Sequence, residues 1–307
     1  MYHYHEPVLL QPSVDALVTN PDGTYVDVTF GGGGHSREIL SRLSEKGKLI
    51  AFDQDEDALA NQIDDPRFTL VNHNFAHLKS YLHYLKAIPV LGILADLGIS
   101  SHQIDVDTRG FAHRLNGPLD MRMSKHSSVT AASLLNSSNM EELVRIFRNY
   151  GEIPNAGKLA QTIINSRKGE PFNNIEQFKT QIQSCTPKAT PAKYLSQVFQ
   201  ALRIAVNKEM EVLETFLNDA GQCIAEDGKL VVISYHSLED RLVKHLLQTG
   251  NTDGKRHTDM YGGIDKPFDS QPNRAITPDE SEIEKNKRAR SAKMRIGVRN
   301  SWKSNNR

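Results

Sequence analysis

The sequence predicts an α/β fold in which a mostly parallel sheet is interrupted by a small helical domain. Residues 24–53 read as a strand, a glycine turn, a helix and a second strand. Residues 90–95 form a nearly continuous apolar run, and residues 228–234 return to strand after a long helical stretch. A strand-helix-strand unit of this length makes its two strands parallel and its crossover right-handed. These observations place one sheet on both sides of a helical insertion.

Composition sets the bounds on this fold. The chain has 307 residues, of which 38% are hydrophobic and 24% charged, as in a soluble globular protein of one large or two modest domains. Basic and acidic residues balance at 37 each, so a nucleic-acid surface would require local clustering. The only cysteines, Cys185 and Cys223, are too few for a disulfide framework or a zinc site, which suits the cytoplasm. We expect no metal, and no export signal or membrane span.

The first strand is expected over residues 24–30, where aromatic and β-branched residues stop at the glycine run 31–34. Apolar residues then recur at helical spacing over residues 37–43. A second strand, residues 49–52, is closed by Asp53. Ligands of such sheets bind at the carboxyl ends of the strands, so the glycines and Asp53 are expected in the ligand crevice.

The glycine turn and Asp53 suit a cofactor with a ribose, because glycine allows close backbone approach and a carboxylate binds the ribose hydroxyls. A nicotinamide fingerprint, G-x-G-x-x-G, would need glycine at position 36, which is Ser36. S-adenosylmethionine has the ribose but no pyrophosphate, so this serine counts more against a nicotinamide cofactor. The structural alternative is a tight turn without a ligand and Asp53 as a helix cap.

Further elements follow before the insertion. Asp55 can cap a helix, and residues 68–71 form a third strand, after which Phe75 lies where an adenine ring could stack. Residues 90–95 predict a central strand covered on both faces. Asp96, at the tip of that strand, is expected to project into the crevice, the alternative being that it caps a turn.

From residue 105 to about 197 the pattern changes, and we expect sheet residues 1–104 and 198–307 to flank a loop and helical insertion, 105–197. Residues 105–125 form a long loop that carries Arg109, Arg114 and Arg122 among apolar residues, which indicates a functional loop. Short helices are expected to begin after Asn139 and Asn174. One or two long helices then span residues 195–224.

The last third of the chain returns to the sheet. The strand 228–234 is followed by Tyr235 and His236, which are expected in the crevice. Ser237 with Asp240 predicts a helix N-cap rather than a nucleophile. Residues 251–282 are polar and predict a mobile surface loop, and residues 292–299 alternate as a strand. Residues 285–307 contain nine Lys or Arg, among them Arg288, Arg290 and Lys293, and no acid. This is the one basic region.

Several stretches together resemble the RsmH (MraW) methyltransferases nearly end to end. They are His5-Glu-Pro-Val-Leu, Thr29-Phe-Gly-Gly-Gly-Gly-His-Ser36, Asp96-Leu-Gly-Ile-Ser-Ser101, Arg109-Gly-Phe, Gly117-Pro-Leu-Asp-Met-Arg-Met, Phe199-Gln-Ala-Leu-Arg-Ile-Ala-Val-Asn, Ser234-Tyr-His-Ser-Leu-Glu-Asp-Arg and Arg288-Ala-Arg-Ser-Ala-Lys. The departures are Gly32 at a variable position, Tyr235 where phenylalanine is usual and Lys287 in place of a usual proline.

This resemblance implies a Rossmann-like S-adenosylmethionine-dependent methyltransferase sheet with an antiparallel C-terminal strand. It implies a cytoplasmic enzyme that methylates N4 of a cytidine in the decoding region of small-subunit ribosomal RNA. By motif, the cofactor contacts fall on Gly33, Gly34, His35, Asp53, Phe75, Asp96 and Gln103. The oligomeric state stays open, a homodimer included, as does the choice between naked RNA and an assembled subunit as substrate.

The residues also suggest how such chemistry would proceed. A cytosine amine is a poor nucleophile, so the site must align it and accept its hydrogen bonds. Asp96 is the best placed acceptor, with Tyr235 or His236 as candidates to stack on a base that has left its stack. Neither cysteine follows a strand end, which favours transfer to nitrogen over C5. A nicotinamide oxidoreductase and a non-catalytic RNA-binding protein are the alternatives.

Overall fold

The computed structural model describes residues 7–258 and 262–301. The chain forms two compact units, which we call the sheet unit, Met1–Gly98 with Met210–Arg307, and the helical unit, Ile99–Glu209. Each is described by itself. In the part of the chain described here, the helices are too short or too polar to span a bilayer.

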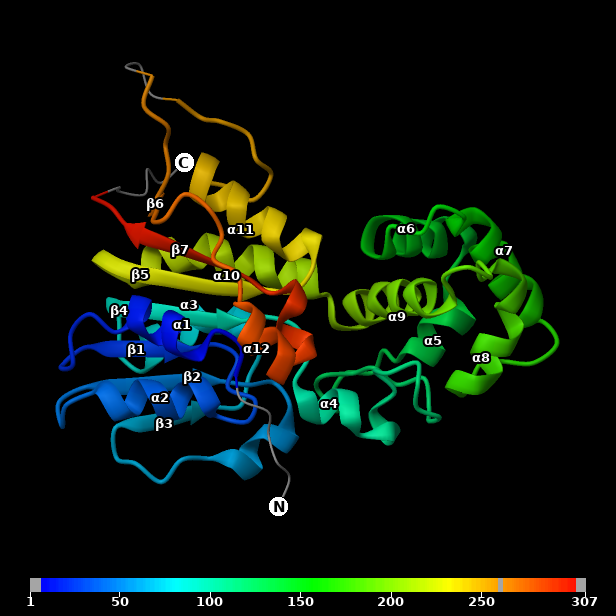
Figure 1. The fold of residues 1–307 in the computed structure, drawn as a ribbon, viewed down its shortest axis with the longest axis horizontal. Helices are drawn as coiled ribbons and strands as arrows, with labels where there is room; N and C mark the ends of the chain where they lie inside the picture. Colours follow the sequence, from blue (N-terminus) through cyan, green and yellow to red (C-terminus); the bar gives the residue numbers. More distant parts are fainter. Residues whose placement is uncertain (1–6, 259–261, 302–307) are drawn as a thin grey trace. The chain divides into compact units, whose positions relative to one another are not determined.

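The sheet unit is built on a sheet that, within the described residues, has seven strands in the order β3-β2-β1-β4-β5-β7-β6 (Figure 1). Its strands in chain order are β1 (Thr24–Asp27), β2 (Lys48–Phe52), β3 (Phe68–Val71), β4 (Val90–Asp96), β5 (Ile224–Ser234), β6 (Phe268–Ser270) and β7 (Lys293–Arg299). The first five pair in parallel, and β7 pairs antiparallel with both β5 and β6. The predicted α/β class, the mostly parallel sheet and the antiparallel C-terminal strand are confirmed.

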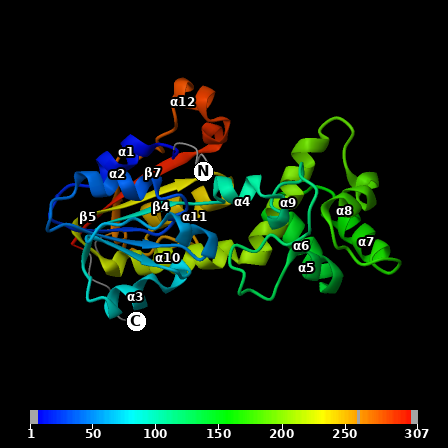
Figure 2. The same ribbon diagram turned by 90° about the horizontal axis from the view of Figure 1, so that it is seen from below.

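Helices cover both faces of this sheet because alternate side chains of each strand point to opposite faces. Val26 and Ile93 join the core that includes residues of α3, α10 and α11, whereas Tyr25 and Leu94 join the core that includes residues of α1 and α2 (Figures 1 and 2). The helices are α1 (Leu10–Leu17), α2 (Gly34–Arg42), α3 (Leu78–Tyr84), α10 (Glu209–Cys223), α11 (Ser237–Thr249) and α12 (Glu280–Lys285). The predicted central strand, β4, is therefore covered on both sides.

The helical unit has a core of its own. Its helices are α4 (Ser101–Asp105), α5 (Ala131–Ser137), α6 (Met140–Gly151), α7 (Ala156–Ser166), α8 (Ile175–Gln181) and α9 (Pro191–Asn207). Asn139 and Asn174 cap α6 and α8 by accepting the backbone N–H three residues on, as predicted. The expected boundary at residue 197 falls inside α9. α9 ends at Lys208, whose φ of 51° is left-handed, and α10 begins at the next residue.

Short 3₁₀ helices complete the chain: η1 (Glu56–Asn61), η2 (Phe75–His77), η3 (Asp107–Arg109), η4 (Gln183–Cys185) and η5 (Lys287–Ser291). The helix expected after Asp55 is one of these, η1. Asp55 caps it, as predicted, by accepting the N–H of Asp57 at 3.1 Å. Its hydrogen bonds reach back only three residues, as from Ala58 N to the Asp55 carbonyl, which makes it a 3₁₀ and not an α-helix.

Two expected elements differ from the structure. The strand expected to start at 228 begins at Ile224, which pairs with Val90 across an irregular register. The surface loop expected over residues 251–282 contains β6 and the start of α12. Phe268 of β6 is fully buried, so this edge strand is held by packing that a local polar composition does not reveal.

Candidate active site

The strand order reverses between β1 and β4, and the carboxyl ends of adjacent strands at such a switch point form the ligand crevice of open α/β sheets. β1 ends at Asp27 and β4 ends at Asp96. The glycine turn follows β1, and Asp53 follows β2 on its other side. Tyr235 follows β5, which pairs with β4. The residues singled out from the sequence in the sheet unit therefore gather at one edge of the sheet.

The glycine turn brings bare backbone to this edge. Gly33 is the N-cap of α2 with a φ of 74°, a left-handed conformation that favours glycine, and no side chain of the described residues caps the helix there. A Cβ on Gly34 would lie 2.2 Å from Cγ of Pro7, so no larger residue fits. The turn thus presents amides of the first turn of α2, which can bind a negatively charged or polar group of a ligand.

Asp53 is tied to this turn. Its Oδ2 accepts the Gly31 N–H at 2.7 Å and its Oδ1 accepts the Asp55 N–H at 2.8 Å. Burial raises the pKa of Asp53 to about 6. The two N–H groups lower this pKa by a smaller amount, and the nearby carboxylates of Asp55 and Asp27 raise it slightly. Each carboxylate oxygen has a second lone pair, so Asp53 can still accept hydrogen bonds from two hydroxyls of a ligand.

Asp96 lies at the centre of a second group. Its Oδ1 accepts a hydrogen bond of 2.8 Å from the Tyr235 hydroxyl, and its Oδ2 lies 3.7 Å from Nδ1 of His35. Burial raises the pKa of Asp96 to about 6, against the lowering effects of His35 and Tyr235. A carboxylate whose pKa lies near neutrality can accept a proton during a reaction and release it again.

Asp27 was not singled out from the sequence. It is 1% exposed, and it accepts hydrogen bonds from Ser36 Oγ at 2.7 Å and from the Thr29 N–H at 3.0 Å. Thr29 Oγ1 in turn accepts the Asp96 N–H at 2.7 Å. β1 ends at Asp27 and not at Phe30 as expected, although the N–H groups of Val28 and Phe30 still donate to the carbonyls of Leu94 and Phe52. The available signal was an acid inside an apolar run, which needs buried partners.

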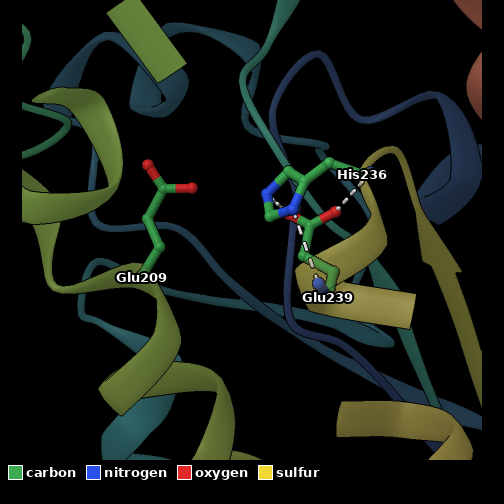
Figure 3. Close-up of side chains that lie close together, drawn as sticks. All are labelled: Glu209, His236 and Glu239. Carbon is green, nitrogen blue, oxygen red and sulfur yellow. Dashed lines mark hydrogen bonds and ion pairs between the residues drawn. The ribbon is translucent and has the colours of Figure 1, made fainter. Parts of the chain in front are cut away.

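His236 caps α11, which corrects the expected cap at Ser237. Nδ1 of His236 accepts the Glu239 N–H at 3.4 Å, and Oε2 of Glu239 accepts the N–H groups of Tyr235 at 2.8 Å and His236 at 3.3 Å. Figure 3 shows the His236 ring beside the Glu239 carboxylate. Nε2 of His236 lies 3.1 Å from Oε1 of Glu239. An imidazole nitrogen can thus supply the capping acceptor that the expected Ser237 would have supplied. Figure 3 also draws Glu209, whose carboxylate pairs with Arg203 at 2.8 Å within the helical unit.

The remaining expected cofactor residues belong to different units. Phe75 is half-buried in the sheet unit, where its ring lies edge-on to Phe216 with centroids 5.4 Å apart. Gln103 is buried in the helical unit, where its side chain accepts the Ser100 N–H at 3.1 Å in the capping box of α4. Phe75 therefore lies beyond β3 on the same sheet edge as Asp53, and Gln103 holds the first helix of the other unit.

The loop arginines differ from one another. Arg109 is 7% exposed, and its guanidinium donates to the carbonyls of Arg122 and Met123 at 2.9 and 3.2 Å, so it holds the loop from inside. Arg122 forms a two-pronged pair with Asp120, at 2.8 and 2.7 Å. Arg114 is exposed and pairs with Asp105 at 2.8 Å. Of these three side chains, that of Arg114 is the most accessible to a phosphate.

The C-terminal basic residues of the described chain lie on η5 and β7. Arg290 is exposed on η5, Arg288 beside it is half-buried, and Lys293 is half-exposed at the start of β7. Nζ of Lys293 lies 3.6 Å from Oδ2 of Asp240, which also binds Arg295. Positions 302–307 of the expected basic region lie outside the described residues.

Comparison with known proteins decides the family. A model of the MraW methylase family matches residues 2–300. The chain belongs to the MraW methylase family. Two similar relatives bear the name ribosomal RNA small subunit methyltransferase H: one from Bacteroides thetaiotaomicron is 52% identical over 95% of this chain and 96% of its own, and one from Flavobacterium johnsoniae is 50% identical over 95% and 97%. The resemblance stated from the sequence is confirmed.

Solved structures are more distant. An rRNA methylase from Streptococcus thermophilus has a TM-score of 0.42 and 10% identity, over 95% of this chain and 94% of that one. The MraW methylases are S-adenosylmethionine-dependent methyltransferases, so the cofactor expected from the sequence is confirmed, and neither a nicotinamide oxidoreductase nor a non-catalytic RNA-binding protein is favoured.

Proposed function

We propose that this MraW methylase transfers a methyl group from S-adenosylmethionine to the exocyclic N4 amine of a cytidine in small-subunit ribosomal RNA. The observation that carries the proposal is the Asp96 carboxylate, which is buried at the tip of β4, bonded to Tyr235 and linked through Thr29 to the start of the glycine turn. A general acceptor therefore stands where the cofactor and the base would meet. The relatives' names supply the RNA substrate.

The residues of the sheet unit fit the cofactor. Asp53 would bind the ribose hydroxyls, the amides of the Gly33–Gly34 turn would bind the polar end of the methionine part, and Phe75 would lie beside the adenine. His35 is 5% exposed, and its Nε2 has no hydrogen-bond partner among the described residues, which marks a polar atom that a bound molecule would satisfy. When bound, S-adenosylmethionine supplies an electrophilic methyl group on sulfur.

Asp96 would act on the amine. The lone pair of a cytosine N4 amine is delocalised into the ring, so a hydrogen bond from that amine to a carboxylate aligns the nitrogen and raises its electron density. Transfer would form the N–CH₃ bond as the S–CH₃ bond breaks, which leaves a positive charge on the nitrogen, so the nitrogen must lose a proton. Asp96 can take it, because burial has raised the pKa of this carboxyl to about 6. The target base must leave its stack to reach this edge.

RNA would be held through its phosphates. Arg288, Arg290 and Lys293 lie together on η5 and the start of β7, and Arg114 is exposed on the helical unit. Contacts of this kind supply affinity without sequence preference. We assign no phosphate contact to the buried Arg109, and only a weak one to Arg122, whose fork is occupied by Asp120. Small-subunit ribosomal RNA is found in the cytoplasm, which is where we place the protein.

The decisive experiment supplies purified small subunits, and separately naked small-subunit RNA, with isotopically labelled S-adenosylmethionine. We expect label in N4-methylcytidine, identified by mass spectrometry of the digested RNA, and none with Asp96→Ala. Label in 5-methylcytidine or in another nucleoside would overturn the assignment to N4. The absence of labelled RNA with either substrate, from a protein that binds S-adenosylmethionine, would overturn the activity.

A further inference from the structure

We infer that Tyr235 is a positioning residue, which keeps the Asp96 carboxylate ionised and turned toward the incoming amine. The inference rests on the proposed function, since it concerns the group that would receive the amine's proton. The Tyr235 hydroxyl is 2.8 Å from Oδ1 of Asp96. A phenol has one hydrogen to donate, and here that hydrogen goes to the carboxylate. Oδ1 is therefore held, which leaves Oδ2 as the oxygen for a substrate.

Glu239 holds Tyr235 in this position. Glu239 is 2% exposed, and its Oε2 accepts the backbone N–H groups of both Tyr235 and His236. His236 closes the arrangement by accepting the Glu239 N–H through Nδ1. Glu239 of α11 thus fixes the backbone of Tyr235 from the C-terminal side. The tyrosine ring packs against the core that includes residues of α1 and α2. Because its backbone is held, the Tyr235 hydroxyl can keep the Asp96 carboxylate in one orientation.

The charged groups around Asp96 explain why such a residue is needed. Asp27 on β1 and Glu239 on α11 carry like charges, which, together with burial, favour the protonated form of Asp96. His35 on α2 and the hydroxyl of Tyr235 oppose them. His35 approaches only to 3.7 Å, whereas the tyrosine donates a direct hydrogen bond. Without that bond the carboxyl would be protonated over more of the neutral range and could not accept from the amine.

Tyr235→Phe tests this, because it removes the hydroxyl and keeps the ring. A hydrogen bond to a charged group alters an acid constant by about tenfold, so the pKa of Asp96 should rise by about one unit. In protein with labelled aspartate carboxyl carbons and no cofactor, an NMR titration should show this shift directly. In single-turnover methyl transfer, the acid limb of the pH–rate profile should move up by the same amount. The rate should fall about fivefold near pH 6 and about ninefold near pH 5, and it should approach that of wild type near pH 9.

Tyr194→Phe is the matched control, since it removes a hydroxyl that binds Asn155 in the helical unit and should move neither reading. A Tyr235→Phe protein that is folded, as judged by its melting temperature, but has an unshifted Asp96 titration would overturn the inference. So would a rate loss that is equal at every pH, because a packing role predicts that. Failure of the proposed function would give a different result. Wild-type protein would then leave the RNA unmethylated, while the pKa of Asp96 measured by NMR would still be higher in Tyr235→Phe than in wild type.

Discussion

Oγ of Ser36 donates a hydrogen bond of 2.7 Å to Oδ2 of Asp27, and both side chains are almost completely buried. The bond joins the end of β1 to the first turn of α2 across the glycine turn. Ser36 is also the residue that breaks the nicotinamide fingerprint. The glycine of that fingerprint could not make this bond, so the serine has a structural reason to be there, which is to satisfy a buried acid.

Ser36→Ala should therefore destabilise the sheet unit. It leaves the Asp27 oxygen with one donor fewer in a buried site, at a cost of about 1–3 kcal/mol. Urea denaturation measures the loss. Ser41→Ala is a suitable control, because Ser41 is an exposed residue of the same helix whose hydroxyl donates to the Glu38 carbonyl. Equal stability of the two variants would show that Asp27 does not depend on Ser36.

Asp53→Ala should weaken binding of S-adenosylmethionine. Hydrogen bonds between ribose hydroxyls and a carboxylate contribute roughly 1.5–3 kcal/mol, which corresponds to about a 10- to 150-fold loss of affinity in calorimetry. Asp64→Ala, which removes an exposed acid after η1, should bind like wild type. Affinity unchanged in folded Asp53→Ala protein would remove the glycine turn as the cofactor site.

Asp96→Asn should raise stability at neutral pH while it abolishes methyl transfer. The pKa of Asp96 is raised from 3.8 to about 6, so the folded protein holds a proton that the unfolded chain has already released. Stability from this group is present below about pH 4 and is lost as the pH rises through about 6. Asparagine avoids that loss and still accepts from Tyr235. The free energy of unfolding of the variant should exceed that of wild type on the order of 1–3 kcal/mol at pH 8 and match it near pH 4. A difference independent of pH would contradict the raised pKa.

Replacing Arg288, Arg290 and Lys293 with alanine should weaken RNA binding and flatten its dependence on salt. Each lost phosphate contact should reduce the slope of log affinity against log salt by about one unit, while affinity for S-adenosylmethionine stays constant. Fluorescence anisotropy with a short RNA measures the slope. Lys46→Ala with Lys48→Ala removes exposed charge at the amino end of β2, away from the site, and should leave the slope unchanged. An unaltered slope in the triple variant would place RNA elsewhere.

Cys185→Ala with Cys223→Ala should keep the single-turnover rate within a few-fold of wild type. Methylation at C5 of cytosine needs a thiolate to add to the ring. Both cysteines are buried, and burial raises the pKa of Cys223 to about 12, so it stays a thiol. Melting temperatures allow for lost packing. A folded double variant without activity, or a covalent adduct with RNA that contains 5-fluorocytidine, would overturn transfer to nitrogen.

Local sequence patterns determined much of this protein. The glycine run and the strands on either side of it predicted the turn and the parallel unit, because strand and helix have different hydrophobic periods and glycine marks the turn between them. Asp53 and Asp96 could be placed at the site because each follows an apolar strand, and parallel strands carry their ligands at that end. Asn139 and Asn174 were predictable caps, since a cap bonds only three residues along the chain.

Tertiary structure alone decided which polar groups meet. Tyr235 and Asp96 are 139 residues apart in the sequence, and only the pairing of β4 with β5 brings the hydroxyl to the carboxylate. The role of Arg109 could not be predicted for the same reason. The sequence suggested a cation on an exposed loop, but the guanidinium donates to carbonyls 13 and 14 residues further along the chain. A charged side chain buried by its own loop has the same sequence pattern as one that faces solvent. Its role is set by the hydrogen-bond partners that the fold supplies.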